Sequence, residues 1–135
     1  MKLYFNDKVE NINISDTKKG AFFDYTNINS DPKNEYVFAY ENKLRVNDIE
    51  KNKLFETELI ENITEQPLFF KMPDKSKKIG IVTEGNIYLL NESGVIEEDF
   101  PLAGSTLFSI SDLNNDNTLN LVVADKDILY MYNLE

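Results

Sequence analysis

The stretch "DLNNDNTLNLVVAD", residues 112–125, joins a loop of short oxygen-bearing side chains to an unbroken apolar run. It belongs to a longer segment, "LFSISDLNNDNTLNLVVADKDILYMYN" (107–133), that matches "FFDYTNINSDPKNEYVFAYENKLRVN" (22–47) without a gap, 85 residues apart. The aligned pairs are Phe23 with Phe108, Ile28 with Leu113, Asn29 with Asn114, Asp31 with Asp116, Val37 with Val122, Ala39 with Ala124 and Leu44 with Leu129. A pattern that returns at fixed spacing indicates a repeat architecture.

A third copy lies midway between these two, at "LFFKMPDKSKKIGIVTEGNIYLLN" (68–91). Val82 aligns there with Ala39 and Ile87 with Leu44, whereas the polar loop is shorter. The repeat unit is therefore about 42 residues long. We predict a single domain over 1–135, made of a partial unit at 1–20, units at 21–63 and 64–105, and a second partial unit at 106–135.

Each unit is typical of β-structure, because short runs of β-branched, aromatic and leucine residues alternate with Asn, Asp, Gly and Ser. In the middle unit we expect strands at 67–72, 78–84, 86–91 and 94–102. Four antiparallel strands in about 42 residues match one β-propeller blade. The sequence thus predicts an all-β fold of about three four-stranded antiparallel blades, a partial propeller or arc.

The second strand of the unit predicts how these sheets pack. "YVFAY" (36–40) and "LVVA" (121–124) are apolar on consecutive residues, as expected for a strand that is covered on both faces. Blades stacked side by side would provide that cover.

The two ends of the chain fall inside a unit. "KLYFND" (2–7) is similar to the third-strand segment "KLRVND" (43–48), and the chain closes on another third strand, "ILYMYNLE" (128–135). Two interpretations stay open: the last blade borrows its outer strand from "KVENINI" (8–14), or the chain is part of a longer propeller. Because three blades cannot close a ring, we expect apolar end faces and association with a second copy or with the rest of a parent protein.

Charge and composition exclude several functions. The chain carries 24 acidic and 14 basic residues, a formal charge of -10, which disfavours nucleic acid and anionic membranes as partners. It has no Cys and no His, which removes thiol chemistry, thiolate metal sites and Ser-His triads. The N-terminus does not resemble a signal peptide, and no apolar run reaches 18 residues, so we expect a soluble chain that does not insert into a membrane. The compartment stays open. A parent protein that is secreted or belongs to the cell envelope is compatible with these observations.

The loop and strand of 112–125 resemble the FG-GAP or VCBS type of propeller repeat, and "NIYLLNESGVIEEDFPLAG" (86–104) is similar to the adjoining part of bacterial propeller blades. The resemblance implies a Ca²⁺ loop, with ligands that would be Asp112, Asn114, Asp116, the carbonyl of Thr118, and Asn120. Two positions depart from the family pattern: Asn117 stands where the family has Gly, although Asn can adopt a positive φ, and Asn120 stands where it has Asp.

With two carboxylates in the loop, we expect a Ca²⁺ dissociation constant no tighter than about 10⁻⁴ to 10⁻³ M. The alternative is that the same side chains form Asx turns and cap loop amides. The related loops are poorer in charge, with Asn27, Asn29 and Asp31 in the first copy and Asp74 in the middle copy.

These observations predict a non-catalytic scaffold or protein-protein interaction module rather than an enzyme. The alternative is a calcium-dependent or lectin-like adhesion module, with a glycan stacked on tyrosines. The tyrosines at strand positions, which more often pack between sheets, are Tyr36, Tyr40, Tyr88, Tyr130 and Tyr132.

Overall fold

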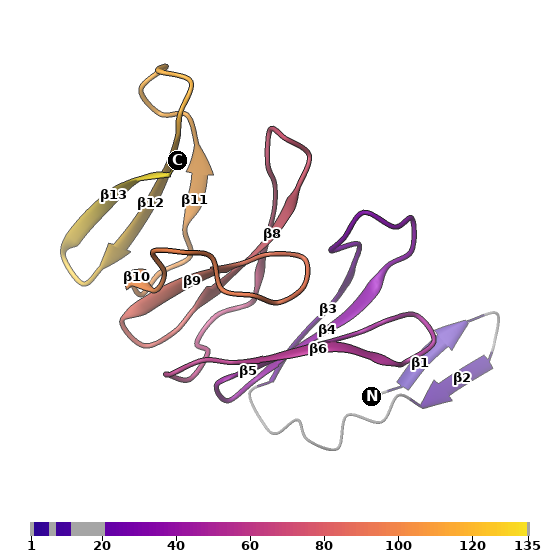
Figure 1. Cartoon of the computed structure of the whole chain (residues 1–135). Helices are drawn as coiled ribbons and strands as arrows, with labels where there is room; N and C mark the ends of the chain where they lie inside the picture. Colours follow the sequence, from indigo (N-terminus) through magenta and orange to yellow (C-terminus); the bar gives the residue numbers. More distant parts are fainter. Residues whose placement is uncertain (1, 6–7, 12–20, 135) are drawn as a thin grey trace.

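The fold consists of antiparallel sheets that follow one another along the chain (Figure 1). The structure, a computed structural model, describes residues 2–5, 8–11 and 21–134, and within these ranges it contains strands and turns but no helix. Three sheets have three or four strands each and none is closed. The prediction of an all-β fold is therefore confirmed.

Consecutive strands are neighbours in every sheet, as in a meander. The first sheet holds β3 (Phe22–Thr26), β4 (Glu35–Tyr40), β5 (Lys43–Asn47) and β6 (Lys53–Glu58). The second sheet holds β7 (Leu68–Lys71), β8 (Lys77–Val82), β9 (Asn86–Leu90) and β10 (Leu102–Ala103). The third sheet holds β11 (Ser109–Ser111), β12 (Leu119–Asp125) and β13 (Ile128–Leu134).

Residues that align in the sequence occupy the same register in the three sheets. The pairs across the second and third strands are Ala39 with Leu44, Val82 with Ile87, and Ala124 with Leu129. The register between the first two strands also recurs, because Asp24 faces Val37 just as Ser109 faces Val122. The aligned residues therefore form equivalent cross-strand pairs.

Two apolar clusters hold the sheets together face to face. The first joins one face of β4 and β5, including Val37 and Leu44, to Ile79, Ile81 and Tyr88 of the second sheet. Burial of such side chains supplies the main driving force for packing, at roughly 25 cal/mol per Å² of apolar surface.

The second cluster joins the opposite face of the second sheet to the third. It contains Val82 and Ile87 on one side and Phe108, Leu121 and Val123 on the other. Gly80 makes this approach possible, since a Cβ there would lie 2.6 Å from the Phe108 ring. The second sheet is thus packed on both faces.

We call the face that each sheet directs to the next sheet its forward face. In the first sheet it carries Val37, Ala39, Leu44 and Val46, all buried. The equivalent side chains of the third sheet, Val122, Ala124, Leu129 and Met131, remain accessible: Leu129 is 72 % exposed and Met131 61 %.

The prediction that the second strand is covered on both faces is thus confirmed for β4, which is buried at every position. It is wrong for β12, in which Asn120, Leu121 and Val123 are buried whereas Val122 and Ala124 are only partly buried. The physical reason is that no further sheet among the described residues packs on the forward face of the third sheet.

The predicted fourth strand at 94–102 is also wrong for most of its length. Only an isolated bridge from Ile96 to Leu90 and the two residues of β10 pair with β9. Between them Asp99 has φ 72°, in the left-handed region, and Phe100 donates its backbone N–H to the carbonyl of Glu97. A turn therefore interrupts the edge, and Pro101 adds no backbone donor to restore it.

At the N-terminal end, β1 (Lys2–Phe5) and β2 (Lys8–Asn11) form a two-stranded antiparallel hairpin. Residues 8–11 pair with β1, so they do not complete the third sheet as an outer strand, and the remainder of the predicted segment 8–14 lies outside the described residues. Over the described ranges, no helix is long and apolar enough to cross a membrane.

Candidate functional site

The polar loops of the three copies share one local hydrogen-bond pattern. Asp31, Asp74 and Asp116 each accept, through Oδ1, the backbone N–H of the residue two positions later, at 2.8, 2.9 and 2.9 Å. In two copies a hydroxyl, of Ser76 or Thr118, donates to the same oxygen at 2.6 Å. These are Asx turns, as the alternative interpretation of the loops predicts.

The loop 112–120 is closed by further contacts of this kind. Both carboxylate oxygens of Asp112 accept backbone N–H groups, from Asp116 at 3.2 Å and from Asn117 at 2.9 Å. Asn115 and Asn117 have φ of 60° and 67°, so Asn117 adopts the left-handed conformation expected of it. The hydroxyl and N–H of Thr118 lower the pKa of Asp116, because both stabilise its ionised form.

The ninth loop position has a structural role in two copies. The backbone N–H of Leu113 donates to Asn120 Oδ1 at 3.0 Å, and the aligned N–H of Ile28 donates to Glu35 Oε1 at 2.9 Å. Asn120 and Glu35 are both buried, and Asn120 also donates to Asn133 Oδ1 at 2.7 Å. The side chain at this position thus ties the polar loop to the start of the second strand.

Of the five predicted ligands, the structure gives Asp112, Asp116 and Asn120 hydrogen bonds within the loop, and Asn114 contributes a side-chain hydrogen bond to Asp116. Thr118 serves the Asp116 turn through its N–H and hydroxyl. The Oδ1 atom of Asn120 accepts a backbone N–H of the loop and does not point to a metal position shared with the other predicted ligands. Across the described chain, no three Asp, Glu, His or Cys side chains are grouped to hold a metal ion.

Burial raises the pKa of Glu35 above that of an ordinary glutamate, and Asp31 acts in the same direction. The Ile28 N–H and Lys77 oppose this effect without cancelling it. Below a pH of about 4 the side chain is protonated in both states. As the pH rises, the unfolded chain ionises first, so the stability falls until Glu35 also ionises in the fold, and above that pH the full cost persists.

Glu35→Gln is therefore expected to raise the free energy of unfolding more at pH 7 than at pH 4. The amide can still accept the Ile28 N–H, as Asn120 does for Leu113. Urea unfolding at the two pH values measures the difference. An equal change at both pH values would contradict an elevated pKa of Glu35.

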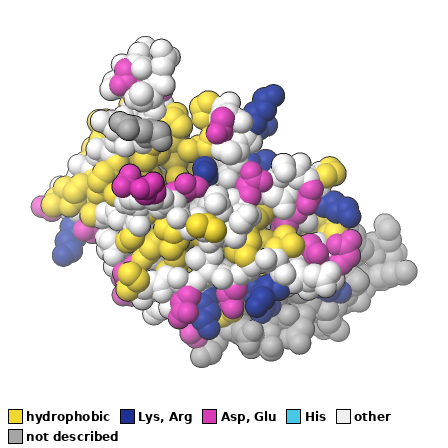
Figure 2. All heavy atoms as spheres, viewed as in Figure 1, with side chains coloured by type: hydrophobic (Ala, Val, Ile, Leu, Met, Phe, Trp, Pro, Cys, Tyr) yellow, Lys and Arg dark blue, Asp and Glu magenta, His cyan; other side chains and the backbone are white. Residues whose placement is uncertain are grey.

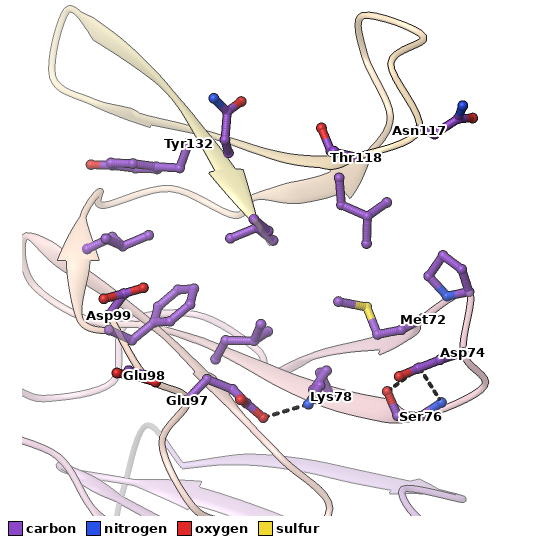
Figure 3. Close-up of a pocket in the computed structure, with 17 residues that line it drawn as sticks. Met72, Asp74, Ser76, Lys78, Glu97, Glu98, Asp99, Asn117, Thr118 and Tyr132 are labelled. Carbon is purple, nitrogen blue, oxygen red and sulfur yellow. Dashed lines mark hydrogen bonds and ion pairs between the residues drawn. The ribbon is translucent and has the colours of Figure 1, made fainter.

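An open cleft of about 750 Å³ lies between the second and third sheets (Figure 3). Its walls come from the β7–β8 turn, the segment 97–102, the loop tip at Asn117 and Thr118, and the end of β13. Tyr132 faces the cleft from β13 and donates its hydroxyl to the carbonyl of Ala103 at 3.0 Å. The predicted calcium loop thus borders a cleft.

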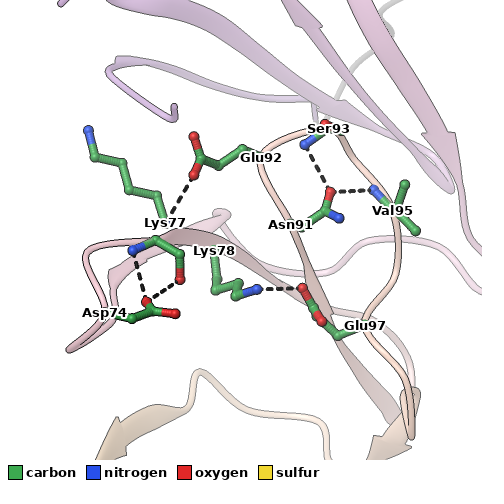
Figure 4. Close-up of polar contacts among 9 residues, drawn as sticks. Asp74, Lys77, Lys78, Asn91, Glu92, Ser93, Val95 and Glu97 are labelled. Atoms are coloured by element: carbon green, nitrogen blue, oxygen red, sulfur yellow. Dashed lines mark hydrogen bonds and ion pairs between the residues drawn. The ribbon is translucent and has the colours of Figure 1, made fainter. Parts of the chain in front are cut away.

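The cleft is acidic. Its lining includes the carboxylates of Asp74, Glu97, Glu98 and Asp99, whereas the lining cation Lys78 is paired with Glu97 (Figure 4). The same view shows the Asx turn at Asn91, whose Oδ1 accepts the Ser93 and Val95 amides and turns the chain out of β9. Such a cleft suits neutral hydroxylated groups or cations and disfavours anions.

A second polar centre, which the sequence did not predict, lies between the first two sheets. Glu61 accepts hydrogen bonds from the hydroxyls of Thr83 and Tyr88, both at 2.9 Å, and from Asn86 Nδ2 at 3.1 Å. Burial acts to raise the pKa of Glu61, but these three donors outweigh it and lower the pKa. Burial and the Glu61 contact raise the pKa of Tyr88 to about 12.

The tyrosines divide between packing and the cleft. Tyr36, Tyr40 and Tyr88 are buried, as expected for packing residues. Tyr130 and Tyr132 are half-buried and stacked, with ring centroids 5.8 Å apart and planes 6° apart. Only Tyr132 of these two lines the cleft, so the stacking surface is small.

Comparison of the chain with models of protein families, with curated proteins and with solved structures gives no match.

Proposed function

We propose that this chain is a non-catalytic module of propeller-type repeats that scaffolds or binds another protein. Three sheets with equivalent cross-strand pairs support blade-like repeats, and the resemblance of 112–125 to FG-GAP or VCBS repeats agrees with them. The polar groups of the loops are committed to Asx turns and strand anchors, which favours a structural use over catalysis.

One observation carries the proposal: the forward face of the third sheet has an accessible apolar centre, formed by Val122, Ala124, Leu129 and Met131. Contiguous apolar surface of this kind marks interaction sites in soluble proteins. Figure 2 shows hydrophobic side chains gathered at the left of the view, over the C-terminal strands. Because the equivalent residues of the first sheet are core residues, this surface has the composition of a core that lacks its second half.

Site-specific photo-cross-linking in cells of the source organism tests this proposal. With p-benzoylphenylalanine at position 131, on the forward face, we expect a cross-linked product heavier than the chain. The matched control places the same residue at position 60, which is also apolar and is 79 % exposed elsewhere. Absence of any product at 131, or equal labelling at 60, would refute a contact role for this face.

A calcium-dependent or lectin-like module is the second candidate. It is favoured by the position of Asn117 and Thr118, which place the tip of the predicted calcium loop at the rim of a cleft that also carries Tyr132. A sugar ring could stack on this tyrosine, and the acidic lining offers acceptors for hydroxyl groups.

A calcium titration decides this second candidate. With a dissociation constant of about 10⁻⁴ to 10⁻³ M, 10 mM Ca²⁺ is expected to add about 1.4 to 2.7 kcal/mol to the free energy of unfolding. Asp116→Asn, which removes one of the two loop carboxylates, should abolish most of this gain, and 10 mM Mg²⁺ serves as the ion control. An unfolding curve that is the same with calcium and with chelator would eliminate the candidate.

A further inference from the structure

The repeat itself indicates what the forward face of the third sheet is built to contact. The forward face of the first sheet packs on the second sheet, and that of the second sheet packs on the third. Leu129 and Met131 align with Leu44 and Val46, and Leu113 aligns with Ile28. Each of the three is at least 50 % exposed, whereas its counterpart is buried. The face therefore fits another sheet rather than a small ligand.

The strands that form this face present no charge on it. Alternation along the strands places on it the side chains of Ser109, Ser111, Asn120, Val122, Ala124, Leu129, Met131 and Asn133. A neutral face does not select a partner of opposite charge. A second copy of a chain with formal charge -10 can thus dock there without burying a like charge.

A head-to-tail arrangement would require the opposite end of the second copy to offer a free face. On the first sheet that face carries Tyr36, Phe38 and Tyr40, each at most 5 % exposed, so it is already covered. The forward face of the second copy is the free counterpart of matching composition. Contact between identical faces closes with two-fold symmetry, the commonest arrangement of homo-oligomers.

We propose that the chain forms a two-fold dimer in which the forward faces of the two third sheets pack against each other around Leu129 and Met131. This inference rests on the proposed function, because it specifies the protein that the contact face binds. Sheets packed in this way lie about 10 Å apart, so that Leu129 and Met131 of both copies interdigitate.

Light scattering of the intact chain is the first test. At high protein concentration the mass is expected to approach twice 15.6 kDa, and Leu129→Asp should return it to 15.6 kDa. Ile60→Asp is the matched control and should leave the dimer intact, with circular dichroism confirming that both variants fold. Added NaCl should strengthen the dimer, because it screens the repulsion between two acidic copies.

The arrangement is tested with single cysteines, since the chain has none of its own. Leu129→Cys and Met131→Cys are expected to form cross-linked dimers with a short bismaleimide, whereas Ile60→Cys should not. A monomer at every concentration and salt, or a dimer that survives Leu129→Asp, would overturn the inference. A dimer without cross-links at 129 and 131 would overturn the two-fold arrangement. A cross-link at 131 in cells to a different protein, with no dimer in solution, would leave the proposed function standing and overturn only this inference.

Discussion

Leu44→Ala is expected to lower the free energy of unfolding by about 2 to 5 kcal/mol, the range for removing a buried leucine. Leu44 is 0 % exposed and belongs to the cluster that joins the first and second sheets. The loss combines the transfer of the side chain with the cavity that remains, because neighbouring sheets cannot fully close around it. Urea unfolding followed by tyrosine fluorescence measures the change.

Leu129→Ala is the matched control for this prediction. The two leucines are aligned in the repeat and pair across the strands with Ala39 and Ala124, respectively. Because Leu129 is largely exposed, its truncation should change the free energy of unfolding by no more than about 0.5 kcal/mol in monomeric protein. Dilution into the monomeric range keeps the dimer contact out of the measurement. Equal losses in the two variants would contradict the placement of the sheets.

Glu61→Ala is expected to cost at least about 2 kcal/mol, since one hydrogen bond to a charged group contributes about 1.5 to 3 kcal/mol. The variant removes the acceptor of three donors and leaves the hydroxyl of the buried Tyr88 without its carboxylate. The cost should shrink in acid. The pKa of Glu61 is lowered in the fold, so its contribution is present above the unfolded value of about 4.3 and disappears as the pH falls through the folded value.

Tyr88→Phe is the control for this network. It removes one of the three donors to the carboxylate and keeps the ring in the core, so we expect a loss of about 1.5 kcal/mol, the lower end of the range for a hydrogen bond to a charged group. Chemical unfolding at pH 7 and pH 3 measures both variants. A Glu61→Ala variant that is no less stable than Tyr88→Phe at pH 7 would show that the carboxylate does not organise this junction.

The sequence predicted the pairing of the central strands in each sheet because the same residue pairs recur. The alignment of Val82 and Ile87 with Ala39 and Leu44 translates directly into cross-strand pairs, since register follows the apolar pattern. The Asx turns at Asp31, Asp74 and Asp116 could be predicted for the same reason, because these residues align in the three copies. The outer strand of the middle unit could not be predicted correctly. Its segment "GVIEEDFPL" has strand-like residues, but a turn at Asp99 interrupts it.

Two polar residues of the site were missed for different reasons. Glu35 could have been found, because it aligns with Asn120, 85 residues later, and both accept the N–H of the second loop residue. Glu61 lies in the connection between two sheets, where the copies do not resemble one another. Its donors, Thr83, Asn86 and Tyr88, come from β9 and the turn before it and meet Glu61 only after the sheets have packed.

Among the described residues, the middle sheet is the one whose two faces both take part in the inter-sheet clusters, and this determines how the molecule should open. Exchange of amide protons with solvent should be slowest in β8 and β9, because opening them requires both interfaces to separate. The β11–β13 sheet, which is held on one side, should fray first and refold onto the remainder as a unit. A partner bound to the forward face of the third sheet would then slow amide exchange in β12 and β13 and leave the exchange rates of β4 unchanged.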